Sequence, residues 1–168
     1  MFQIQFETFA EITREKFAFL WPSTQLTPPT EANIPTIFTE IYARDYYCFT
    51  EVPLKMGGRI DMVLIEKKYS KEITFCEFKS SKNNSIVEIQ KDIDRLDRLT
   101  IEDLYYFSKC TPLSELWKVI FQWSENETEV DKNMKILNEK YPHNFKKGII
   151  ECDAELFCLF AAWQSVTE

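Results

Sequence analysis

Residues 59–79 read RIDMVLIEKKYSKEITFCEFK, and this stretch decides the predicted fold. Two largely apolar runs, 59–65 and 73–79, flank the polar segment 66–72, which is the pattern of two strands joined by a turn. Because side chains alternate between the faces of a strand, Glu77 and Lys79 share one face, and Asp61 lies on the face that also carries Val63. We therefore expect two paired strands, each with a charged end.

The register of this pair follows from where the turn lies. If the strands are antiparallel and Ile65 lies near Ile73, Asp61 falls beside Glu77. Two carboxylates facing each other across a ladder destabilise it by roughly 0.2–1 kcal/mol. A divalent cation between them would offset that repulsion, and Lys79 would add a further positive charge. This register is an assumption that the structure must test.

The flanking sequence predicts helices on both sides of three strands. Apolar spacing favours helices at 6–20 and 33–43, and a strand at 46–56 precedes the Gly57–Gly58 turn. Ser85, with Glu88 three residues later, is a capping-box pattern that opens a further helix with apolar positions up to Leu96.

The remaining chain predicts further helices at 111–123 and 126–141. The segments 147–152 and 156–163 fit either two strands or a strand and a buried helix, because periodicity does not separate these alternatives. We expect one domain over residues 1–168, with a core at about 33–99 and extra helices and final strands at 101–168. The fold class is α/β (α+β), a mixed sheet flanked by helices.

Composition excludes several classes of site. Three glycines are too few for a phosphate-binding loop or a dinucleotide fingerprint, and one histidine, His143, excludes a multi-histidine zinc centre. Five cysteines without a CxxC pair indicate reduced thiols. No apolar run approaches the roughly 18 residues of a membrane span, and no signal peptide is evident. We expect a cytoplasmic protein without a membrane partner.

The charged residues resemble the motif of the PD-(D/E)XK nuclease superfamily. The resemblance rests on Glu40, on the sequence GRID at 58–61 and on the sequence CEFKS at 76–80, and it covers residues 33–99. Ile60 stands where many members have proline. Such nucleases have a restriction-endonuclease-like core of order αβββαβ, so the resemblance implies this arrangement here.

The resemblance also implies roles for individual residues. Asp61 and Glu77 match the acidic ligands of Mg²⁺ (or Mn²⁺), and Lys79 matches the lysine that positions the attacking water. Glu40 matches the acidic residue on the first helix, a further metal ligand, and Gln90 matches the polar residue on the second helix.

Glu51 is an alternative to Glu40 as the third acidic group. A two-residue turn at Gly57–Gly58 places Leu54, rather than Glu51, on the face of Asp61, whereas a three-residue turn reverses that assignment. The sequence analysis favours Glu40.

Two functions remain open at this point. The first is a Mg²⁺-dependent endonuclease acting on DNA, which is also compatible with a homodimer. The net charge of −7 opposes DNA binding, although residues 66–100 carry eight Lys and Arg against seven Asp and Glu. The second is a catalytically silent nuclease-like fold whose acidic surface inhibits a basic toxin, as an immunity protein does.

Overall fold

The computed structural model describes residues 2–20, 33–68, 72–80, 86–104, 115–151 and 155–165, and of residues 17–20 it describes the backbone alone. The expected cap at Ser85 and the expected helix start at 111–114 lie outside these ranges. In chain order the elements are α1 (Phe6–Leu20), α2 (Asn33–Tyr42), β1 (Tyr46–Pro53), β2 (Arg59–Glu66), β3 (Glu72–Ser80), α3 (Ile86–Arg98), the 3-10 helix η1 (Ile101–Asp103), β4 (Glu115–Ser124), α4 (Glu127–Lys140), β5 (Lys146–Ile150) and β6 (Leu156–Gln164).

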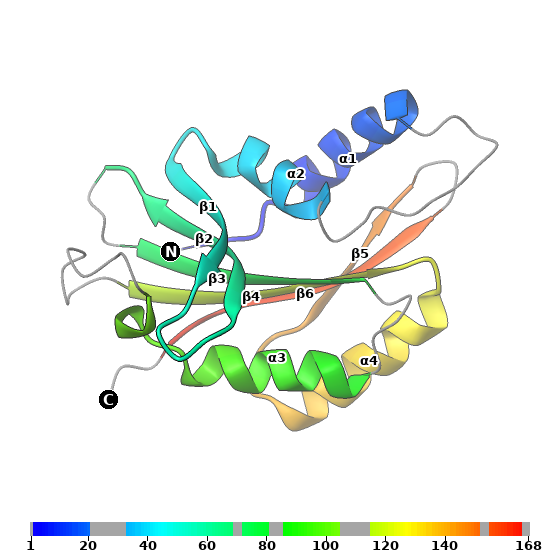
Figure 1. Ribbon diagram of the computed structural model, residues 1–168. Coiled ribbons are helices and arrows are strands. Elements are labelled where there is room, and N and C mark those ends of the chain that lie inside the picture. Colours follow the sequence, from blue (N-terminus) through cyan, green and yellow to red (C-terminus); the bar gives the residue numbers. More distant parts are fainter. Residues whose placement is uncertain are drawn as a thin grey trace.

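The strands form one mixed sheet in the order β1-β2-β3-β4-β6-β5 (Figure 1). The first three strands are an antiparallel meander. β3 and β4 are parallel and are connected through α3, whereas β4 pairs antiparallel with β6 and β6 with β5. The expected α/β class with a mixed sheet is therefore confirmed, and the order helix, three strands, helix, strand runs from α2 to β4.

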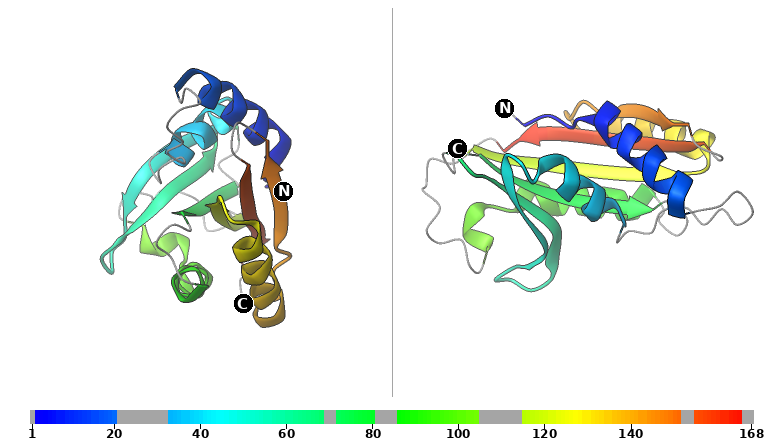
Figure 2. Two further views of the ribbon diagram at one scale, coloured as in Figure 1. Left: turned by 90° about the vertical axis from the view of Figure 1, so that its right-hand side faces the viewer. Right: turned by 90° about the horizontal axis from the view of Figure 1, so that it is seen from above.

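Helices cover both faces of the sheet (Figures 1 and 2). α1 and α2 lie on one face, where Phe9 and Phe38 pack with Phe78 and Phe121 in the largest apolar cluster. α3 and α4 lie on the opposite face, and Ile93 and Val130 belong to a cluster there. This division matters for the site, because residues on α2 and on α3 are separated by the sheet.

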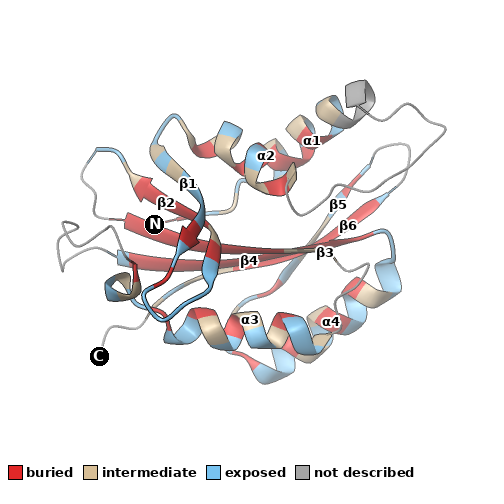
Figure 3. Cartoon of the chain, viewed as in Figure 1, coloured by how far each residue is buried: buried red, intermediate tan, exposed pale blue. Residues whose placement is uncertain are grey.

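The strand β4 corrects the expected helix at 111–123. Its side chains from Leu116 to Ser124 are all buried, as Figure 3 shows for the centre of the sheet. A strand covered by helices on both faces is buried along its whole length rather than at alternate residues, so its mainly apolar sequence does not distinguish it from a buried helix. Pairing with both β3 and β6 decided the outcome.

The C-terminal third otherwise follows the sequence pattern. The expected helix at 126–141 is α4, and its N-cap Asn126 accepts a hydrogen bond from the backbone N–H of Glu129 at 3.2 Å. Both segments left open at 147–152 and 156–163 are strands, β5 and β6. Among the described residues, no helix has the combined length and apolar character that crossing a membrane requires.

Candidate functional site

Asp61 and Glu77 meet at the point where β2 and β3 separate. The ladder pairs Ile65 with Ile73, as assumed, and its last pair is Met62 with Cys76. One residue further, Asp61 lies opposite Glu77. There a side-chain hydrogen bond takes the place of backbone pairing: Oδ2 of Asp61 accepts a hydrogen bond from the backbone N–H of Phe78 at 2.7 Å.

Glu77 is a buried carboxyl group. Its side chain is 1% exposed, and Nη2 of Arg95 approaches Oε1 to 2.5 Å. Neither oxygen accepts a hydrogen bond from a described N–H or O–H donor, so the arginine contact is an ion pair without hydrogen-bond alignment. Burial, and after it the charge of Asp61, raises the pKa of Glu77 to about 8, although Arg95 and Lys79 act in the opposite direction.

The short ion pair and the raised pKa indicate opposite protonation states for Glu77. Burial and the neighbouring carboxylate outweigh the arginine, so the pKa of Glu77 lies above its ordinary value. Burial also raises the pKa of Asp61, while the hydrogen bond from the Phe78 N–H and the charge of Lys79 lower it. Because the charge of Asp61 raises the pKa of Glu77, the two carboxyls titrate as a pair.

Helix α3 contributes two residues that the sequence analysis missed, Asp92 and Arg95. Nζ of Lys79 lies 3.5 Å from Oδ2 of Asp92, and Nη2 of Arg95 lies 3.4 Å from Oδ1 of the same carboxylate. Nη1 of Arg95 also donates a hydrogen bond to the backbone carbonyl of Arg59 at 3.2 Å. Asp61, Glu77, Lys79, Asp92 and Arg95 therefore form one cluster, called the charged cluster below.

The sequence feature that could have identified Asp92 and Arg95 is their position on α3. Ile89, Ile93 and Leu96 face the sheet. At 100° per residue, Asp92 and Arg95 lie together on one flank of that apolar stripe. A charged i, i+3 pair on a helix flank is common on surfaces, so spacing alone does not assign it to a site.

Gln90 lies on the other flank of α3. Its backbone carbonyl accepts a hydrogen bond from the hydroxyl of Tyr141 at 3.2 Å, and Asp94, one turn later, accepts from the same hydroxyl at 2.6 Å. Because Tyr141 follows α4, this flank faces α4. The structure therefore does not bring Gln90 to the charged cluster.

Glu40 also lies away from the charged cluster. It is on α2, across the sheet from α3, and its Oε2 is 2.5 Å from Nζ of Lys16 on α1. The apolar residues of α2 pack on Met62 and Phe78, whose side chains point to the face opposite Asp61 and Glu77. The helix-borne acidic residue that the resemblance implies is therefore not near this cluster.

Glu51, the alternative third acidic residue, is the one near Asp61. The β1–β2 ladder pairs Thr50 with Met62 and Val52 with Ile60, so Glu51 lies opposite Asp61. Its backbone has a φ of 53°, a left-handed conformation unusual for glutamate, which interrupts the ladder as a bulge does. Its negative charge acts to raise the pKa of Asp61.

The turn that places Glu51 is the three-residue alternative considered from the sequence. The last ladder pair is Pro53 with Arg59, and the backbone N–H of Leu54 donates to the carbonyl of Gly58 at 3.1 Å, which leaves residues 55–57 as the turn. Gly57 and Gly58 adopt φ values of 87° and 81° there, which glycine tolerates without strain. Nη1 of Arg59 lies 3.5 Å from Oε2 of Glu51.

The donor set of the charged cluster fits a hard divalent cation. Carboxylate oxygens are the ligands that Mg²⁺ prefers, and both oxygens of the buried Glu77 lack hydrogen-bond donors in the described part of the chain. Residues 2–20, 33–68, 72–80, 86–104, 115–151 and 155–165 contain no ready-made group of three or more His, Cys, Asp or Glu side chains in metal-binding geometry. The fit therefore rests on Asp61 and Glu77.

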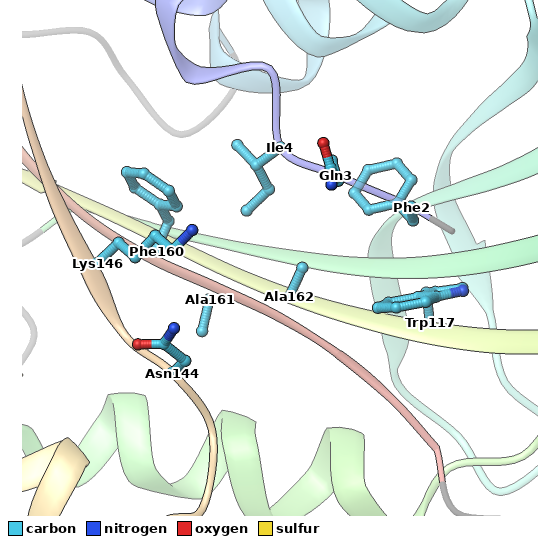
Figure 4. A pocket seen from close by; sticks show the side chains of 9 residues that line it. All are labelled: Phe2, Gln3, Ile4, Trp117, Asn144, Lys146, Phe160, Ala161 and Ala162. Atoms are coloured by element: carbon cyan, nitrogen blue, oxygen red, sulfur yellow. The ribbon is translucent and has the colours of Figure 1, made fainter.

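A separate cavity of about 380 Å³ lies between the N-terminal segment and the strands β4, β5 and β6 (Figure 4). Its lining includes the apolar residues Phe2, Trp117 and Phe160, and its polar residues are Gln3, Asn144 and Lys146. It contains no residue of the charged cluster and no acidic side chain. The cavity and the cluster are therefore distinct features.

Comparison with known proteins leaves the interpretation to the structure itself. No family model, no curated protein sequence and no solved structure matches this chain.

Proposed function

We propose that the chain is a Mg²⁺-dependent nuclease that hydrolyses phosphodiester bonds of DNA. The observation that carries the proposal is the meeting of Asp61 and Glu77 at the end of the β2–β3 ladder, with Lys79 two residues further along β3. A buried, incompletely paired carboxylate costs stability, and such groups persist mainly where they have a function.

The arrangement of the elements supports the same proposal. α2, the meander β1–β3, the crossover helix α3 and the parallel strand β4 follow one another in the αβββαβ order of restriction-endonuclease-like domains. The candidate ligands lie on the two central strands of this unit. We therefore propose a restriction-endonuclease-like core that extends to β4, beyond the expected boundary at residue 99.

In this mechanism Asp61 and Glu77 would hold Mg²⁺ or Mn²⁺. When bound, the ion supplies positive charge that polarises the scissile phosphate and lowers the pKa of a coordinated water. The Phe78 N–H fixes the orientation of Asp61 through its 2.7 Å hydrogen bond. Lys79, with a side chain 22% exposed, orients the attacking water and stabilises charge developing on the phosphate.

Cleavage of supercoiled plasmid DNA with Mg²⁺ or Mn²⁺ tests the proposal. We expect the wild-type protein to nick the plasmid, and Asp61→Asn and Lys79→Ala to lower the rate at least about 100-fold, as removal of one electrostatic contact to a transition state commonly does. Glu40→Gln is the matched control, because Glu40 lies across the sheet, and it should retain the wild-type rate. Equal nicking by Asp61→Asn would place the activity elsewhere.

The second candidate is an inhibitor without nuclease activity that binds a basic toxin protein. The net charge of −7 and the compensation of Glu77 by Arg95 favour it. It predicts no cleavage of DNA or RNA with either ion and no calorimetric heat on addition of metal. Heat of metal binding together with nicking would exclude it.

A further inference from the structure

We propose that Arg95 is an exchangeable counter-ion: its guanidinium occupies the cation position beside Glu77 in the metal-free protein and leaves that carboxylate when a divalent cation binds. This inference rests on the proposed metal site at Asp61 and Glu77. It adds a positioning residue on α3 that sets how tightly the site binds metal.

The need for a cation comes from the burial of Glu77. Its side chain is 1% exposed, and its oxygens accept no hydrogen bond from a described donor. A carboxylate in this environment requires a positive charge in contact with it. Arg95 is the cationic side chain that contacts it, at 2.5 Å.

The contacts that hold the Arg95 side chain in place are incomplete. Its side chain is 35% exposed, its contact with Asp92 is 3.4 Å long, and its hydrogen bond to the Arg59 carbonyl is 3.2 Å. Nε is buried and has no hydrogen-bond partner among the described residues. A guanidinium with one orphaned donor and an exposed outer edge loses little by moving toward solvent.

The charge balance of the cluster favours the exchange of Arg95 for a divalent ion. With its carboxyl groups ionised, as at the mildly alkaline pH of the test below, the charged cluster has three carboxylates, Asp61, Glu77 and Asp92, and two cationic side chains, Lys79 and Arg95, which leaves one negative charge uncompensated. With Arg95 withdrawn, the imbalance is two negative charges, which a divalent ion neutralises. The two cations therefore compete for one carboxylate.

The Arg95→Gln variant tests this competition. Calorimetric titration with Mn²⁺ at mildly alkaline pH should show binding about tenfold tighter than in the wild type, since removing a unit charge a few ångströms away is worth at least that much. In chelator the variant should unfold at a lower temperature than the wild type, and Mn²⁺ should raise its unfolding temperature by more. An arginine with only a structural role would lower stability without tightening metal binding.

Arg98→Gln is the matched control. Arg98 lies on the same helix, is exposed and donates through Nε to the backbone carbonyl of Asp94 at 2.9 Å. The substitution removes the same charge from α3 outside the charged cluster. We expect its Mn²⁺ affinity to stay within about twofold of the wild type. Equal tightening in both variants would overturn the inference in favour of a general charge effect.

A measurement on the wild-type protein covers the case in which Arg95→Gln does not fold. The side-chain ¹⁵N signal of Arg95 Nε, followed during titration with diamagnetic Mg²⁺, should shift as the guanidinium leaves Glu77. An unchanged signal at saturating Mg²⁺ would overturn the inference.

The experiments also separate this inference from the proposed function. Nicking by the wild type with unchanged Mn²⁺ affinity in Arg95→Gln would overturn the exchange and leave the nuclease standing. Tighter Mn²⁺ binding in the variant without any nicking would support the exchange and overturn the nuclease. Absence of metal binding in both proteins would overturn both.

Discussion

Glu77 shows how burial changes the properties of one residue. The surrounding β3 and α3 side chains remove water from its carboxyl group, and Asp61 places a second acidic group beside it. Both effects favour the protonated form, while Arg95 favours the ionised form. The raised pKa of Glu77 means that the folded protein holds this proton to a higher pH than the unfolded chain does.

This retained proton predicts a pH dependence of stability. The pKa of Glu77 is raised from 4.5 to about 8 in the folded protein, so between these values the folded state binds more protons than the unfolded state. The free energy of unfolding should then fall as pH rises from about 4.5 to about 8, and level off above that range. Because one pKa unit corresponds to about 1.4 kcal/mol, the fall should be on the order of a few kcal/mol.

Glu77→Gln should reduce this pH dependence, because the amide does not titrate. Urea unfolding at a series of pH values, in the presence of a chelator, measures it. Glu139→Gln, at an exposed position on α4, is the control and should keep the wild-type slope. A Glu77→Gln slope equal to that of the wild type would show that the carboxyl is not the titrating group.

At the scale of elements, the docking of α1 depends on a glycine in β5. A Cβ added at Gly148 would lie 2.1 Å from the ring of Phe6 at the start of α1. The same ring stacks on Phe160 of β6, with centroids 4.9 Å apart and planes inclined by 12°. Gly148 therefore provides the space in which α1 packs onto this end of the sheet.

Gly148→Ala should lower stability by about 1–3 kcal/mol through overpacking against Phe6. Thermal or urea unfolding measures the effect. In the double variant Gly148→Ala/Phe6→Leu, the smaller side chain at position 6 should relieve part of the clash, so the two effects should be less than additive. Full additivity, or a harmless Gly148→Ala, would show that Phe6 does not pack closely on this glycine.

At the scale of the whole molecule, the net charge opposes the proposed binding of DNA. The net charge is −7, and phosphate neutralisation provides most non-specific DNA affinity. A bound divalent ion would supply the positive charge that the surface lacks as a whole. Metal and DNA binding should therefore be coupled.

Fluorescence anisotropy with a labelled DNA oligonucleotide measures this coupling. With Lys79→Ala, which should not cleave, we expect affinity at least about tenfold higher in Mg²⁺ than in chelator at matched ionic strength. Asp61→Asn should show less dependence on Mg²⁺. Equal affinity under both conditions would mean that the charged cluster does not contribute to DNA binding through metal.

The sequence by itself determined the features that depend on neighbouring residues. Alternation along 59–65 and 73–79, together with the register assumed across the polar turn, placed Asp61 opposite Glu77, and the ladder has that register. The N-cap of α4 and the apolar stripe of α3 were equally local signals. Short connections leave few registers that bury the apolar face, so local pattern suffices.

Only the tertiary structure decided which other groups join the charged cluster. The β1–β2 hairpin gives Glu51 its backbone φ of 53°, and the helix layers place the sheet between Glu40 and Asp61. No local pattern encodes either arrangement. The crossover through α3 selected the flank with Asp92 and Arg95 over the flank with Gln90. β4 became a strand because β3 and β6 pair with both its edges while helices cover both its faces. These outcomes depend on long-range packing, where several placements satisfy the same sequence pattern equally well.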